Sequence, residues 1–145
     1  IRDRLQLEEL KENIKKFNLS DNVFLIGKIN GNLKQKFLES SDVFVMPSYK
    51  VNNSIEGFGI SYIEAAAFRI PSIAGLDGGV TDAVIDKKTG WCVDPLNQEQ
   101  LANVLRDAIN NKDQRQKYGL HAEKKFLQYF LGEKVFRKFM DTISI

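Results

Sequence analysis

Cysteine, histidine and long hydrophobic runs are scarce in this chain, and each shortage excludes a class of protein. Cys92 is the only cysteine among 145 residues, so no internal disulfide can form. Because His121 is the only histidine, there is no cluster at the spacing of zinc ligands. No apolar run approaches the roughly 18 residues of a membrane-spanning helix, and no basic-then-apolar leader is visible. We therefore expect a cytoplasmic chain without structural zinc.

The charge balance is nearly even. The 21 basic and 19 acidic side chains give a formal net charge of +2, so no overall field argues for a nucleic acid partner. Apolar residues make up 43% of the chain, which is enough to fill a core. Since the length falls within the usual size of one domain, we expect residues 1–145 to form a single domain.

The apolar segments alternate between two patterns. Short runs bounded by glycine, proline or polar residues predict strands, and the first two are expected to be buried on both faces. Apolar residues at spacings of three and four predict helices between them. This alternation is typical of an α/β fold with a parallel sheet flanked by helices. The predicted strands cover residues 23–27, 43–46, 71–75 and 91–93, and the predicted helices cover 7–17, 31–40 and 60–68, with a short helical turn from 81.

The second half of the chain is predicted to be mainly helical. Asn97 followed by Gln100 resembles a capping box at the start of a helix. The apolar stripe behind this cap consists of Leu101, Val104, Leu105, Ala108 and Ile109. Two further stretches keep helical register, namely the aromatic-rich series Tyr118, Ala122, Phe126, Tyr129 and Phe130, and residues 135–143.

A glycine-containing loop precedes the helix predicted over 60–68. Gly57 and Gly59 carry no side chain, so a ligand can approach the backbone closely there. The amides of Gly59, Ile60 and Ser61 are then unpaired donors at a helix start, which together with the helix dipole favours a phosphate group. In an open parallel sheet, ligands bind at such carboxyl ends of strands.

Two carboxylates flank the same helix start. Glu56 lies in the loop and Glu64 lies one helical turn after Ile60, on the same face. Because a carboxylate can accept two hydroxyl hydrogen bonds, each is suited to a vicinal diol of a sugar or a ribose. On composition alone, a solvated turn followed by a surface helix is the more common explanation of such a segment.

A longer ordered series of residues resembles one known family. The stretch 56–65, preceded by 41–48 and followed by 71–75, resembles the donor-site region of the group 1 glycosyltransferases, which are family 4 of the retaining enzymes with the two-lobed GT-B fold. The similarity continues through 78–84, 89–90 and 93–95, and it covers roughly residues 5–130. So long a series is more specific than a lone glycine motif.

The resemblance implies a fold and an activity. It implies a Rossmann-like carboxyl-terminal lobe that binds a nucleotide diphosphate sugar. The full-length enzyme would transfer that sugar, with retention of anomeric configuration, to a glycan or lipid-linked acceptor in polysaccharide biosynthesis. Two alternatives stay open at this point: a non-catalytic nucleotide-sugar-binding module, and a sugar-nucleotide epimerase of the same fold.

The resemblance also implies roles for individual residues. Glu56 matches the glutamate that contacts sugar hydroxyls, and we expect it to act in catalysis. Glu64 matches the glutamate that holds the ribose diol. The segment whose amides meet the sugar and phosphates corresponds to Gly57, Phe58, Gly59, Ile60 and Ser61. The backbone that borders the base corresponds to Gly27, Lys28 and Ile29.

We expect no metal and no cofactor besides the nucleotide sugar substrate. Backbone amides and basic side chains would stabilise the leaving group electrostatically, which needs no metal ion. Consistently, the sequence has no Asp-x-Asp signature of the metal-dependent sugar transferases.

The chain departs from the family pattern in several places. The family has glycine where Arg69 stands and commonly another where Lys87 stands, and the loop from 49 to 55 is longer than the shortest family version. The strand and loop with the basic residues that clamp the diphosphate are absent, as is the amino-terminal acceptor lobe. We therefore expect a fragment that is inactive alone and that, if isolated, pairs its strand edges in a dimer or rearranges.

The remaining candidates have plainer interpretations. His121 is expected at the surface, and Cys92 is expected to pack in the core rather than to act in redox chemistry. Trp91, Tyr129 and Phe130 are expected in the core or at a domain contact. From residue 112 onward there are eight basic and four acidic side chains, an excess that suits either a solvated helix face or peripheral contact with the inner membrane face.

Overall fold

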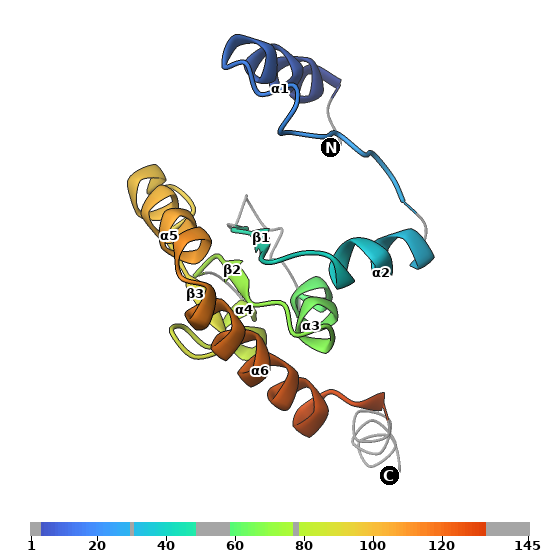
Figure 1. Cartoon of the computed structure of the whole chain (residues 1–145), viewed down its shortest axis with the longest axis vertical. Coiled ribbons are helices and arrows are strands. Elements are labelled where there is room, and N and C mark those ends of the chain that lie inside the picture. Colours follow the sequence, from blue (N-terminus) through green and yellow to red (C-terminus); the bar gives the residue numbers. More distant parts are fainter. Residues whose placement is uncertain (1–3, 30, 49–58, 77–78, 133–145) are drawn as a thin grey trace. The chain divides into compact units, whose positions relative to one another are not determined.

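The computed structural model describes residues 4–29, 31–48, 59–76 and 79–132 (Figure 1). The chain divides into two compact units, Ile1–Lys34 and Gln35–Ile145, and each is described by itself. The first contains α1 (Arg4–Lys16) and the beginning of α2 (Gly31–Glu39). As predicted, α1 ends near Asn18, whose φ of 54° is left-handed. The Leu19 amide donates to the Ile14 carbonyl at 2.9 Å, which closes the helix end.

The strand predicted over residues 23–27 is wrong. This segment is irregular, and Phe24 and Ile26 are 73% and 51% exposed. A parallel strand forms only where a neighbouring strand accepts its backbone hydrogen bonds. Within the described ranges no strand pairs with this segment, so its apolar residues alone do not make it a strand.

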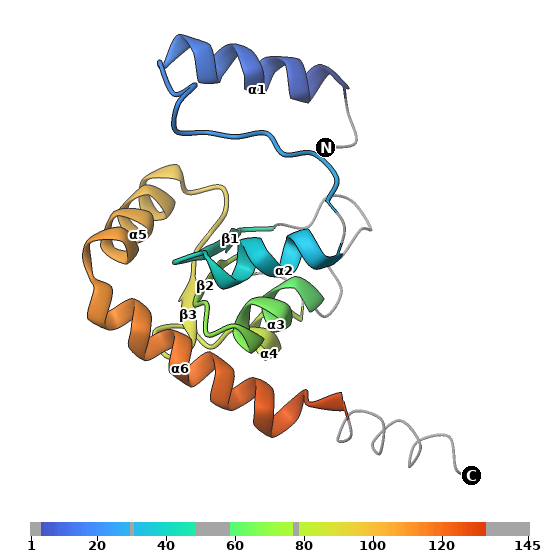
Figure 2. The same cartoon turned by 45° about the vertical axis from the view of Figure 1, so that its right-hand side comes forward.

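In the described part of the second unit, three short parallel strands form the sheet (Figure 2). They are β1 (Phe44–Met46), β2 (Ser72–Ala74) and β3 (Gly90–Cys92), in the spatial order β1-β2-β3. Val45 pairs with Ile73, and Ile73 with Trp91. The α/β prediction with a parallel sheet is thus confirmed. The expectation that β1 is buried on both faces is wrong, because β1 forms an edge of the described sheet and Val45 is 42% exposed. The edge-pairing dimer stays a prediction.

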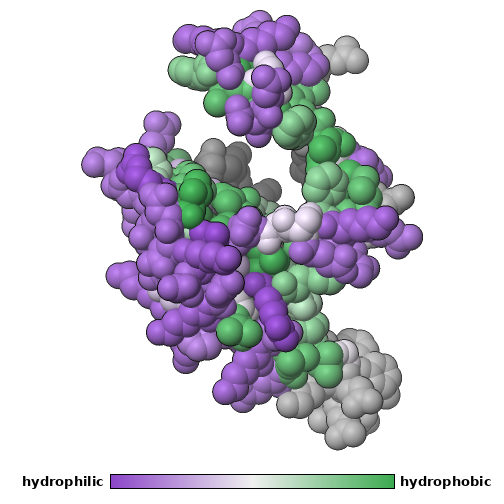
Figure 3. Space-filling model, viewed as in Figure 1, coloured by the Kyte–Doolittle hydropathy of each residue, from purple (hydrophilic) through white to green (hydrophobic). Residues whose placement is uncertain are grey.

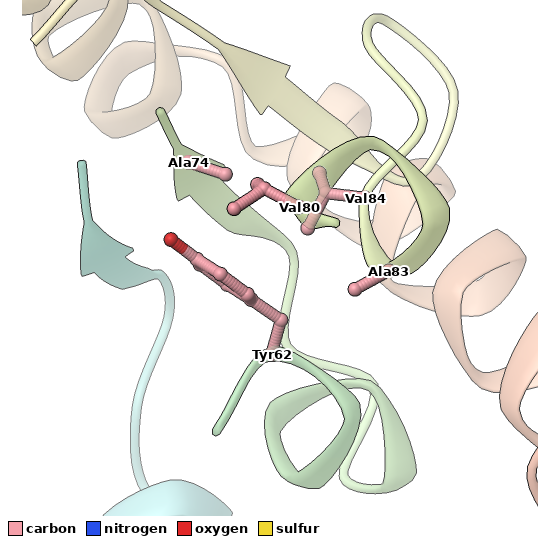
Figure 4. Close-up of a cluster of buried hydrophobic side chains, with 5 residues drawn as sticks. All are labelled: Tyr62, Ala74, Val80, Ala83 and Val84. Carbon is pink, nitrogen blue, oxygen red and sulfur yellow. The ribbon is translucent and has the colours of Figure 1, made fainter. Parts of the chain in front are cut away.

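Helices cover both faces of this sheet. On one face lie α3 (Ile60–Ala67) and α4 (Val80–Ala83), which agree with the predicted helix and helical turn. Figure 4 shows Tyr62 of α3 and Val80 of α4 pointing toward Ala74 of β2. On the other face lie α5 (Gln98–Asn110) and α6 (Lys112–Tyr129). Alternate residues of each strand therefore enter different layers, as the two-residue period of a strand requires.

The layer under α5 and α6 is built around an aromatic pair. Trp91 and Tyr118 meet edge to face, with ring centroids 4.9 Å apart. Both are buried, so the expectation that Trp91 packs in the core is confirmed. The remaining members of this layer are Ile73, Val93, Ala108, Val43, Leu101, Val104 and Leu105. Tyr129, by contrast, is 58% exposed and is no core residue.

The predicted cap of α5 is present with one change of partner. Asn97 Oδ1 accepts from the Gln100 amide at 3.0 Å, as in a capping box. The Gln100 side chain does not return to Asn97 but accepts from the Asp94 amide at 2.9 Å, so it fixes the loop that enters the helix. Ile109 is 68% exposed because it lies about 100° around the helix from the buried Ala108.

Besides Asn18, two described residues other than glycine adopt a left-handed backbone. Arg69 has a φ of 61° and Lys87 a φ of 55°. At both positions the resemblance implies glycine, which takes such dihedrals without steric cost. Arg69 is additionally held by Glu123 of α6, with Nε and Oε2 2.8 Å apart.

Lys87→Gly is expected to stabilise the chain. Removing the left-handed strain stabilises the folded chain by more than the added freedom of glycine stabilises the unfolded chain. We therefore expect the free energy of unfolding to rise by about 0.5–1 kcal/mol. The melting temperature should rise by about 1–4 °C in calorimetry. The matched control is Lys88→Gly, which removes the same charge where φ is not left-handed and should lower the melting temperature. A rise in both variants would show that charge, not backbone strain, is responsible.

The outer faces of α5 and α6 that Figure 3 shows are mostly hydrophilic. None of the helices in the described part of the chain combines the length and the apolarity needed to cross a bilayer.

Candidate functional site

The carboxyl ends of the strands converge at one edge of the sheet. Pro47 and Ser48 follow β1, Gly75 follows β2, and Val93 follows β3. The last strand residue of β2 accepts a further hydrogen bond there, from the Val93 amide to the Ala74 carbonyl at 2.9 Å. In open parallel sheets this edge is where ligands bind, because loops and helix starts meet at it.

Helix α3 begins at a left-handed glycine. Gly59 has φ 66° and ψ 50°, and a Cβ built there would lie 2.6 Å from the Tyr62 ring. Any side chain would thus face both backbone strain and a steric clash. Because residue 59 is glycine, the backbone can take this turn and no side chain at that position covers the first amides of α3.

The amino end of α3 favours an anion. The first amides of an α-helix have no carbonyl partner within the helix, and a glycine N-cap supplies no side-chain acceptor for them. The first turn contains no acidic residue that would offset the positive end of the helix dipole. Ile60 is 70% exposed and Ser61 half-buried. The amides of Gly59, Ile60 and Ser61 therefore form a candidate phosphate site.

Tyr62 fixes this helix start against the sheet. Its hydroxyl donates to the Met46 carbonyl at the end of β1, and its ring meets Phe44 edge to face at a centroid distance of 5.8 Å. Only 1% of its surface is exposed. Sequence reasoning included Tyr62 in the motif but gave it no role. A single tyrosine on an otherwise apolar helix face, close to a glycine, was the available signal.

Ser48 brings a polar group to the same edge. Its hydroxyl is buried, and among the described residues it has no hydrogen-bond partner. The Ser48 carbonyl would lie 2.0 Å from a Cβ built on Gly75, so the backbones after β1 and β2 approach closely only because residue 75 is glycine. A buried hydroxyl without a protein partner can serve a ligand, and sequence reasoning did not select it.

The remaining candidates of the sequence fall into three groups. Glu64 is half-buried on α3, one turn after Ile60, so the structure brings it together with the Gly59–Ser61 amides on one helix. Gly27, with φ 64°, belongs to the first unit with Lys28 and Ile29. Glu56, Gly57 and Phe58 lie outside the described residues, and so do the loop 49–55 and the helix predicted over 135–143.

Cys92 is not a reactive thiol. It packs against the α3 and α4 layer, as expected from the sequence, and burial raises its pKa to about 11, with Asp86 adding to the rise and Lys125 opposing it. Its Sγ lies 3.7 Å from the Val84 carbonyl, a weak hydrogen bond. Because the thiolate is the nucleophile, a thiol with so high a pKa is inert near neutral pH.

A search for metal ligands gives no candidate. Within the ranges that the structure describes, no group of three or more histidine, cysteine, aspartate or glutamate side chains is placed to hold a metal ion.

Comparison with known families decides the relationship. The family described as Glycosyl transferases group 1 matches residues 3–125. The chain belongs to this family. A relative from Corynebacterium glutamicum, named GDP-mannose-dependent monoacylated alpha-(1-6)-phosphatidylinositol monomannoside mannosyltransferase, is 28% identical over 124 residues, which are 81% of this chain and 32% of that protein. This group 1 chain spans only 13–35% of the length of the relatives compared.

Solved structures share the fold of this chain. The C-terminal domain of a group 1 family protein (LpcC) from Francisella tularensis matches with a TM-score of 0.78 and 26% identity, over 89% of this chain and 64% of that one. The Anabaena protein Alr3699/HepE, solved in complex with UDP-glucose, matches with a TM-score of 0.86 over 99% of this chain and 38% of that one. At 20% identity the second likeness concerns the fold alone. The expected parallel sheet flanked by helices, as in a domain of the GT-B glycosyltransferases, is thereby confirmed.

Proposed function

We propose that this group 1 domain binds a nucleotide diphosphate sugar and that the full-length enzyme transfers the sugar, with retention, to a glycan or lipid-linked acceptor. The observation that carries the proposal is the glycine-led start of α3 at the carboxyl edge of a parallel sheet, with Glu64 one turn along. Amides at a helix start, which have no carbonyl partner within the helix, suit the diphosphate, and a half-buried carboxylate suits the ribose diol.

The relationships support a transferase over the two alternatives. The Corynebacterium relative and the Francisella domain both have transferase names, and the Anabaena neighbour was solved with UDP-glucose. By analogy, the donor here is a hexose on a uridine or guanosine diphosphate. In the same proposal, backbone amides and basic side chains stabilise the leaving group without a metal ion or a cofactor. Glu56 is the proposed catalytic residue. The backbone beside the base is formed by Gly27, Lys28 and Ile29.

A cytoplasmic site of action at the inner membrane face is also part of the proposal. The Corynebacterium relative is named for an acceptor based on phosphatidylinositol, which is a membrane lipid component. The basic excess after residue 112 would favour contact with an anionic surface.

Glu64→Ala should weaken nucleotide binding in the full-length enzyme. Losing a charged hydrogen-bond acceptor costs about 1.5–3 kcal/mol, so titration calorimetry with UDP and GDP should show a dissociation constant raised by about 10- to 150-fold for the preferred base. The matched control is Glu99→Ala, an exposed glutamate in the first turn of α5, which should leave binding unchanged. Equal affinities of the Glu64 variant and the parent would remove Glu64 from the site.

Glu56→Ala provides the complementary result. Because we assign Glu56 to the sugar rather than to the ribose, the variant should retain UDP or GDP affinity while turnover of the nucleotide sugar falls.

A thermal-shift panel of nucleotide diphosphates on the full-length enzyme identifies the base, since a ligand that binds the native state raises the melting temperature.

A further inference from the structure

A cationic cavity lies away from the candidate donor site. It has a volume of about 350 Å³ and is formed by α6 and the turn that precedes β3. Three lysines and a histidine line it, namely Lys88, Lys124, Lys125 and His121, together with Tyr129 and Thr89. Among the residues that the structure describes, no aspartate or glutamate lines it. Because the turn leads into β3, the cavity lies toward the amino ends of the strands, whereas α3 starts at their carboxyl ends.

The cavity is lined by one polar stripe of α6. His121, Lys124, Lys125, Gln128 and Tyr129 follow spacings of three and four and so share a helix face. The buried residues Tyr118, Gly119 and Ala122 form the packing face of the same helix. The helix thus has a second, cationic face beside its core face, and that face borders a hollow rather than a flat surface.

The turn that faces this stripe is held rigidly. The Lys88 and Thr89 amides both donate to the Ile85 carbonyl, at 3.1 and 2.9 Å, and Thr89 Oγ1 accepts from the Ile85 amide at 2.8 Å. His121 Nδ1 lies 3.1 Å from the Lys88 carbonyl. Since a carbonyl only accepts, Nδ1 donates in this bond. The turn and α6 are therefore tied together, and the cavity between them is preformed.

One of the cations at the cavity, Lys125, already contacts backbone carbonyls. Lys125 Nζ donates to the Asp82 and Ala83 carbonyls at the end of α4. Burial is the main cause that lowers the pKa of Lys125. The Asp82 carboxylate and Cys92 oppose this, and the charge of Lys88 makes a smaller contribution that lowers the pKa further. Lys88 and Lys125 are thus close enough to repel each other, and an anion in the cavity would relieve that repulsion.

We propose that this cavity is a binding site for a phosphate group. A phosphate has more than one negative charge and several acceptor oxygens, and separate lysine ammonium groups that donate from different directions match it. The phosphate can belong to a free anion or to a lipid headgroup, and the chemistry of recognition is the same. The site is distinct from the helix start at Gly59, so it does not depend on the proposed donor site.

Two-dimensional NMR of the chain titrated with inorganic phosphate tests the free-anion form. The amide signals of Lys88 and Thr89 and the ring signals of His121 should shift, and they report on this cavity even if phosphate also binds at α3. The double variant Lys88→Gln/Lys124→Gln should weaken the response about tenfold or more. The matched control is Lys117→Gln, an exposed lysine of α6 outside the cavity, which should change it by less than about twofold.

Co-sedimentation with vesicles tests the lipid form. Phosphatidylcholine vesicles with and without phosphatidic acid are compared for the parent, the double variant and the Lys117 control. If vesicle binding requires phosphatidic acid and is lost only in the double variant, the site binds a lipid headgroup. If the chain responds to phosphate in NMR but does not bind the vesicles, the site binds a free anion. No response in either experiment, or an equal loss in the Lys117 control, overturns the proposal.

Discussion

Gly119→Ala is expected to destabilise the chain by about 1–3 kcal/mol, although alanine is the better helix former by about 1 kcal/mol. Gly119 lies within α6, and a Cβ built there would lie 2.0 Å from the Arg69 carbonyl oxygen. A backbone atom cannot rotate aside, so either α6 or the turn at Arg69 must move. That turn is already left-handed at Arg69, and Pro71 lies 3.5 Å from the same built Cβ.

Urea denaturation monitored by circular dichroism measures this effect. The matched control is Gly31→Ala in α2, where a built Cβ meets no atom within 4 Å and φ is not left-handed. The control should be neutral or slightly stabilising. If the Gly119 variant unfolds at the same urea concentration as the control, α6 does not pack as closely on the Arg69 turn as the structure shows.

The sequence predicted those elements that a local pattern of residues is enough to locate. The strands at Val45, Ile73 and Trp91 and the Asn97 cap depend on short apolar runs and on a local hydrogen bond, so pattern alone located them. The segment around Phe24 has the same apolar run but is irregular, because a strand also requires a neighbour that no local pattern specifies.

The candidate site was predictable to a similar degree. The glycine-led helix start at Gly59 and the carboxylate of Glu64 follow from spacing and from the family resemblance. The Tyr62 bond to Met46, the close approach of Gly75 to Ser48, and the cavity beside His121 join residues that are distant in sequence. Single-sequence patterns contain no information on such pairs, so only the structure identified them.

Gly59→Ala should affect stability and donor binding together. The left-handed φ of 66° costs an alanine about 1–2 kcal/mol, and the 2.6 Å approach to the Tyr62 ring adds about 1–3 kcal/mol of overpacking. Tyr62 cannot easily yield, because it is buried and its hydroxyl is bonded to the Met46 carbonyl. We therefore expect a loss of about 2–5 kcal/mol in the free energy of unfolding.

The binding effect of Gly59→Ala distinguishes a ligand site from a merely tight turn. The new methyl group displaces the first amides of α3, so nucleotide diphosphate affinity, measured by calorimetry on the folded fraction, should fall even at temperatures where the variant is fully folded. A second variant, Tyr62→Leu/Gly59→Ala, removes the clashing ring but keeps the left-handed strain, so its nucleotide affinity should stay low although the steric clash is gone. Loss of stability with unchanged nucleotide affinity would mean that the start of α3 shapes the fold without contacting the donor.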